Sequence, residues 1–103
     1  MEWETKRGGI RLRRAAKEGD VGAVAALLRG GAAVDAADTG RMVPGCTALI
    51  FAAARGQLEC VRLLLEAGAD TTLRGECEWA DKKTALEWAE INGHAEVTAL
   101  LRG

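Results

Sequence analysis

The sequence contains no serine, one histidine and three cysteines that lack short-range pairing. The sequence therefore gives no support for a nucleophile–base pair of the kind that hydrolases use, because no cysteine lies near a histidine in a defined pair. The C-x-x-C spacing of structural zinc sites is absent. The glycines are spaced as turn punctuation and not as phosphate-binding loops. We expect no enzymatic activity, no cofactor and no metal.

The sequence also lacks an excess of charge and long hydrophobic runs. The net charge is −1, which gives no overall case for binding nucleic acid or a membrane surface. No apolar run approaches the length that spans a bilayer, and the first residues carry no hydrophobic signal segment. Three unpaired cysteines are typical of a reducing compartment, so we expect an intracellular location, in the cytoplasm or alternatively the nucleus.

Aromatic residues are scarce, at 4 %, although hydrophobic residues make up 49 % of the chain. The core must therefore be aliphatic, built from alanine and leucine, which suits thin helices that pack closely. A length of 103 residues predicts one small domain.

The central stretch, residues 47–70, reads TALIFAAARGQLECVRLLLEAGAD and predicts two short helices. Apolar residues recur at helical spacing on both sides of a break at Arg55-Gly56. Thr47 is a suitable N-cap for the first helix, and Gly68 suits the left-handed residue that ends the second. Each helix is too short to be stable alone, so the pair needs neighbours.

The neighbours are near-copies of this pair at an offset of 37 residues. A fixed period of about 20–50 residues is the signature of a stacked-repeat protein. The positions that coincide at this offset are Gly19, Gly56 and Gly93; Ala15, Ala52 and Ala89; and Leu27, Leu64 and Leu101.

These residues resemble the ankyrin repeat, whose pattern runs T-P-L-H-x-A-A-x-x-G-H-x-x-x-V-x-x-L-L-x-x-G-A-D. RRAAKEGDVGAVAALLRGGAAV is similar to a first repeat, and TALEWAEINGHAEVTALLRG to a last one. The resemblance implies an all-α repeat fold, an ankyrin-type solenoid of three helix pairs joined by β-hairpin-like fingers. The copies would span about residues 10–46, 47–83 and 84–103 of a domain covering 10–103, after a lead-in at 1–9. Each interval is four residues longer than the usual period of about 33, and the extra residues fall in the fingers.

Several residues of the end copies have predicted structural roles. Three arginines, Arg11, Arg13 and Arg14, replace apolar residues of the second copy, as in a polar cap on an end repeat. The alternative is that the local basic cluster contacts an acidic partner or phosphate. Thr84 and Glu87 form a capping box, which we prefer to an acid–base role for Glu87. We expect the side chains of Val21, Val24, Leu27 and Leu28 to point inward, and His94 to cap the last helix.

What the resemblance implies about function is binding to another protein through the concave helix surface and the finger tips. The near-neutral net charge does not favour nucleic acid as the partner, and we expect no membrane partner. Trp88 would lie on the partly open concave face. Met42 and Trp79 recur at the same phase of the two fingers, and either fold back on them or form a contact patch. The expected contact residues are Arg14, Lys17, Glu18, Arg41, Met42, Val43, Phe51, Ala54, Arg55, Glu78, Trp79, Trp88, Ile91 and Asn92.

Two alternatives remain open. Residues 1–31 carry a net charge of +3 and residues 69–103 a net charge of −3, which favours head-to-tail self-association. The second alternative is a thiol or zinc protein that uses Cys46 and Cys77, one in each finger.

Overall fold

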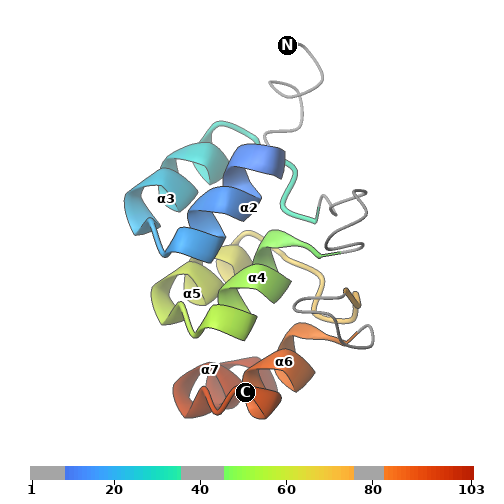
Figure 1. Cartoon of the computed structure of the whole chain (residues 1–103). Helices are drawn as coiled ribbons and strands as arrows, with labels where there is room; N and C mark the ends of the chain where they lie inside the picture. Colours follow the sequence, from blue (N-terminus) through green and yellow to red (C-terminus); the bar gives the residue numbers. More distant parts are fainter. Residues whose placement is uncertain (1–8, 36–45, 76–82) are drawn as a thin grey trace.

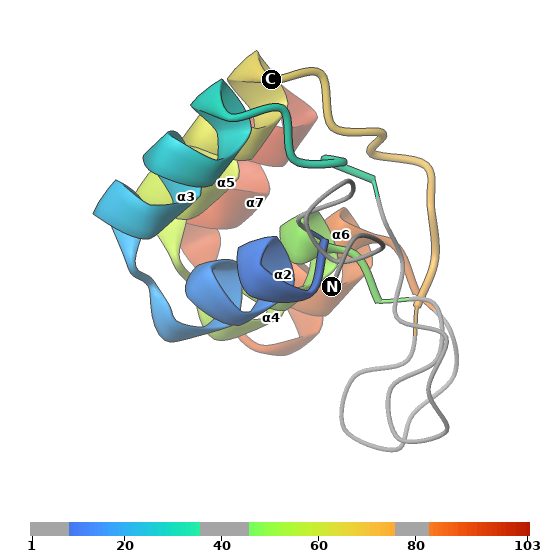
Figure 2. The same ribbon diagram turned by 90° about the horizontal axis from the view of Figure 1, so that it is seen from above.

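The computed structural model describes residues 9–35, 46–75 and 83–103 of the chain. Within these ranges the chain forms short helices in three helix–turn–helix pairs that stack one on the next (Figure 1). The first helices of the pairs form one row and the second helices form another, as the view from above shows (Figure 2). The expected all-α repeat of three helix pairs is therefore confirmed. The helices are α2 (Gly9–Glu18), α3 (Val21–Arg29), α4 (Ala48–Arg55), α5 (Leu58–Glu66), α6 (Ala85–Ile91) and α7 (Ala95–Arg102).

Local sequence sets where the helices begin and end, as predicted. The Thr47 hydroxyl accepts a hydrogen bond from the Ile50 N–H at 3.3 Å, at the start of α4. The capping box of Thr84 and Glu87 opens α6 with both of its hydrogen bonds present. Gly68, directly after the residue that caps α5, has a left-handed φ of 88°.

The core lies between the two rows and is densest at the central pair. Every residue from Ala48 to Ala54 is buried, because α4 is covered on one side by α2 and on the other by α6. Leu64 is also fully buried, whereas Leu27 and Leu101, its equivalents in the end pairs, are partly buried against the core. The prediction that Val21 points inward is wrong. Val21 is 40 % exposed, because it is the first residue of α3 and the turn leaves it facing solvent.

Hydrogen bonds between neighbouring pairs repeat at the same spacing. The Gln57 amide donates to the Lys17 carbonyl at 3.2 Å. One copy later, His94 Nε2 lies 3.0 Å from the Ala54 carbonyl. The prediction that the His94 side chain caps the last helix is therefore wrong: His94 occupies the N-cap position of α7, but its imidazole makes no cap hydrogen bond and reaches back to the preceding pair.

The neck of the second finger is a defined structure. Gly75 and Lys83 exchange two backbone hydrogen bonds, at 3.0 and 3.1 Å, as an isolated antiparallel bridge. At the base of the same finger, the Asp70 N–H donates to the Asp35 carboxylate at 2.8 Å, which links it to the base of the first finger. The described residues contain no strand, so the β-hairpin-like form of the fingers stays a prediction. No helix in the described ranges is long and apolar enough to cross a membrane.

Candidate functional site

The helix residues of the expected contact set come together on one face. They lie from the middle to the end of α2, α4 and α6 and on the residue that follows α6, and these three helices lie side by side in the front row of Figure 1. Because equivalent residues are 37 apart, they form three rows that run along the stack. We name this set the inner-helix face. Its rows are Arg14, Phe51 and Trp88; Lys17, Ala54 and Ile91; and Glu18, Arg55 and Asn92.

Trp88 does not supply the open aromatic surface that the sequence suggested, and that expectation is corrected. Its side chain is only 2 % exposed. The indole N–H donates to the Gly75 carbonyl at 2.8 Å, a buried hydrogen bond that ties α6 to the neck of the second finger. Trp88 therefore acts as a structural anchor, because tryptophan satisfies its single donor when it is buried.

Phe51 is nearly covered as well, at 9 % exposure, and part of the cover comes from the first copy. The Lys17 ammonium lies over the Phe51 ring, 5.9 Å from its centroid. A cation at this distance is attracted by the ring face and keeps its charge directed to solvent. The contact thus fixes a lysine in the middle of the inner-helix face.

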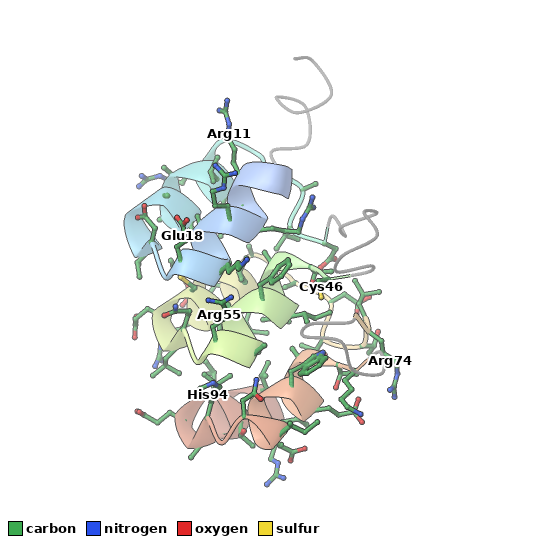
Figure 3. All side chains as sticks on the ribbon, viewed as in Figure 1. Arg11, Glu18, Cys46, Arg55, Arg74 and His94 are labelled. Atoms are coloured by element: carbon green, nitrogen blue, oxygen red, sulfur yellow. The ribbon has the colours of Figure 1, made fainter. Side chains whose placement is uncertain are left out.

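The third copy contributes neutral groups to the face. Ile91 is 59 % exposed, which is high for a large aliphatic side chain. Asn92 is exposed, but its amide donates to the Ala54 carbonyl at 2.8 Å. Both the Asn92 amide and the His94 imidazole therefore contact the Ala54 carbonyl. Figure 3 shows His94 pointing from the third pair toward the second.

The exposed charges of the face carry no ion pair within the described residues. Arg14, Lys17, Glu18 and Arg55 are all exposed, and Figure 3 shows Glu18 and Arg55 at the ends of α2 and α4. The ion pairs in the described ranges lie elsewhere, between Glu59 and Arg62, Arg74 and Glu87, and Glu90 and Arg102.

The remaining predicted contact residues lie in the fingers, outside the described residues. Their role in binding stays a prediction. They are Arg41, Met42, Val43, Glu78 and Trp79.

A family model of ankyrin repeats matches residues 12–103 in three copies. The chain belongs to the ankyrin-repeat family. It is also similar to a rice protein (Oryza sativa subsp. japonica) named probable E3 ubiquitin-protein ligase XBOS33, with 41 % identity over 95 residues. The match covers 90 % of this chain and 17 % of the rice protein, so the ankyrin-repeat chain spans less than a fifth of that relative.

Both ends of the ankyrin stack carry an open groove between the two helices of the end pair. The groove at the third pair has a volume of about 420 Å³ and includes Ala89, Ala99 and Arg102. The groove at the first pair has a volume of about 370 Å³ and includes Arg11 and Leu27. These grooves occupy the sides on which a further pair would stack.

The pKa shifts of two titratable side chains follow from their surroundings. The pKa of Glu87 is lowered, chiefly because the Thr84 N–H donates to its carboxylate. Burial raises the pKa of the Cys60 thiol, which makes a reactive thiolate unfavourable. The described ranges contain no group of three or more histidine, cysteine or acidic residues that could hold a metal. Cys46 is buried, and Cys77 lies outside the described residues, so a site that joins them is untested.

Sequence reasoning missed the equivalent contacts that Gln57 and His94 make with the preceding copy, which a direct comparison at the 37-residue offset could have found. Gln57 and His94 occupy equivalent positions, and the side chain of each contacts a backbone carbonyl of the preceding copy. Each faces the glycine of the preceding turn. A Cβ on Gly19 would lie 2.6 Å from Gln57, and one on Gly56 would lie 2.6 Å from His94.

Proposed function

We propose that this ankyrin-repeat chain is a protein-interaction module without catalytic activity. It binds a partner protein through the inner-helix face and the two fingers. The observation that supports this most directly is the set of exposed charges at the ends of α2 and α4, which form no ion pair within the described residues. The exposed Ile91 lies on the same face. Charges and an aliphatic group held on rigid helices are a suitable surface for recognition.

Site-specific photo-crosslinking in the native cell extract tests this proposal. A benzophenone amino acid at Arg55 should give a discrete adduct, because this side chain projects from the inner-helix face. The matched control places the same group at Arg62, which is also an exposed arginine and lies on α5 in the other row. The same adducts from both positions, or none from Arg55, would contradict the proposed surface.

The contribution of the fingers has its own test. Changing Met42 and Trp79 together to alanine should weaken partner binding while the helical circular dichroism signal is retained. Unchanged affinity would remove the fingers from the proposed surface and leave the inner-helix face.

The similarity to the rice protein does not extend the proposal to ubiquitin transfer. That name describes the whole rice protein, and this chain corresponds to 17 % of it. We propose binding of a partner as the role of this segment, inside the cell. The free, buried cysteine at Cys60 is consistent with a reducing compartment.

A second candidate function is head-to-tail self-association of the stacks. The open grooves at both ends and the opposite net charges of residues 1–31 and 69–103 favour it. Because exposed charges are screened by salt, such association should be strongest at low ionic strength. Sedimentation velocity at low salt decides: a concentration-dependent dimer supports the idea, and a monomer at all concentrations eliminates it.

A further inference from the structure

The inner-helix face changes character along the stack. In the first two copies it carries Arg14, Lys17 and Arg55, all exposed. In the third copy the equivalent positions hold a buried tryptophan, the exposed Ile91 and an asparagine that is hydrogen-bonded to Ala54. The face is therefore basic over α2 and α4 and neutral, with an aliphatic patch, over α6.

The exposed cations over α2 and α4 are positioned to pair with an anionic group of a partner. The Lys17 ammonium lies over the Phe51 ring, an attractive contact that favours an exposed cation at this point of the face. Arg14 and Arg55 lack an ion pair within the described residues. Glu18 is the one carboxylate of the inner-helix face, and the three cations outnumber it. Charge complementarity across an interface steers association and selects partners of opposite sign.

We infer that the inner-helix face binds an acidic segment of the partner protein. Carboxylates of that segment lie against Arg14, Lys17 and Arg55, and an aliphatic side chain lies against the exposed Ile91. This inference rests on the proposed function and adds the chemistry and the direction of the bound segment. The charged end of the segment faces the first copy, and the apolar end faces the third.

A nucleic acid fits this face less well than a peptide. Binding to single strands uses exposed aromatic rings as stacking platforms. The two aromatic side chains of this face are 9 % and 2 % exposed, at Phe51 and Trp88. The exposed Ile91 offers an apolar contact that a phosphate backbone does not use.

Selection from a random 12-residue peptide display library, with the whole chain immobilised, tests the inference. Enriched peptides should be rich in aspartate and glutamate, with an aliphatic residue to one side of the acidic run. Their affinity should fall as salt rises, because the screening length shortens from about 10 Å at 0.1 M to about 3 Å at 1 M.

Two matched double variants locate the contact. Lys17→Gln with Arg55→Gln removes two cations from the face and should weaken the selected peptides by roughly 2- to 30-fold, from two exposed ion pairs. Arg29→Gln with Arg62→Gln removes two exposed cations from the other row and should leave affinity within about twofold, since screened charges away from the site contribute little. Ile91→Ala should cost roughly tenfold through lost apolar contact.

The outcomes separate this inference from the function on which it rests. Enrichment of neutral or basic peptides that lose affinity in Ile91→Ala overturns the acidic specificity and leaves the interaction surface standing. Acidic peptides that respond equally to both double variants overturn the location. A library with no enriched peptide counts against both the inference and a peptide-binding face.

Discussion

Replacing Gly56 by alanine should destabilise the stack through two separate effects. Gly56 has a φ of 74°, in the left-handed region, where an L-residue costs about 1–2 kcal/mol. A Cβ there would also lie 2.6 Å from His94 Nδ1, so the imidazole must move. Moving it breaks the contact with the Ala54 carbonyl, which is worth about 0.5–1.5 kcal/mol. The carbonyl keeps the hydrogen bond from Asn92, so the loss should stay near the lower end.

Gly93 provides a matched control within the same chain. It has a nearly identical φ of 76°, and a Cβ on it would meet nothing within 4 Å. Gly93→Ala therefore carries the backbone cost alone. Both variants restrict the unfolded chain equally, so this contribution cancels in the comparison. We expect Gly56→Ala to cost about 1.5–2.5 kcal/mol and Gly93→Ala about 1–2 kcal/mol.

Urea denaturation followed by circular dichroism and by tryptophan fluorescence measures both costs, and the two signals should coincide if unfolding is cooperative. A double-mutant cycle isolates the steric effect. In a His94→Ala background, Gly56→Ala should cost no more than Gly93→Ala, because the clash is gone. Two results would refute the claim that the imidazole packs against this turn. One is an equal cost of Gly56→Ala and Gly93→Ala in the wild-type protein, and the other is an additive cycle.

Three further predictions concern the third pair. Thr84→Ala should lower the free energy of unfolding by about 1 kcal/mol in urea denaturation, because it removes one half of the capping box; an unchanged midpoint would contradict that role. The Glu87 carboxylate has a lowered pKa in the folded chain, so its stabilisation is present above the unfolded value of 4.5 and is lost as pH falls through the folded pKa. Thermal melts should therefore show a smaller loss of stability on acidification in Glu87→Gln than in the wild type, and parallel pH profiles would argue against it. Trp88→Phe should cost about 0.5–1.5 kcal/mol, because the Gly75 carbonyl loses its indole donor but keeps the hydrogen bond from the Lys83 N–H. Amide exchange at Gly75 and Lys83 should accelerate, and unaltered exchange would show that the neck does not depend on the indole.

The helix pairs could be predicted from sequence because their determinants are local and repeat three times. Threonine caps, glycines at the turns and apolar spacing are readable without neighbours, and all three agree with the structure at α4 and α5. The exposure of Val21 was missed because apolar spacing does not report which end of a helix a neighbour covers. The role of His94 was missed for a related reason. A side chain at an N-cap position was assigned a local bond, whereas its partner lies 40 residues earlier.

The position shared by Arg14, Phe51 and Trp88 shows why the contact surface was harder to predict than the fold. The repeat places all three side chains at the same point of their helices, yet their surroundings differ. Arg14 is exposed in the first pair, Phe51 is covered by Lys17, and Trp88 is turned against the finger neck at Gly75. The group that covers Phe51 comes from the neighbouring first copy, and the group that holds Trp88 comes from the second finger. A repeat pattern fixes backbone position, whereas exposure depends on the residues that differ between copies, so the binding specificity of such a stack is carried by the departures from its own repeat.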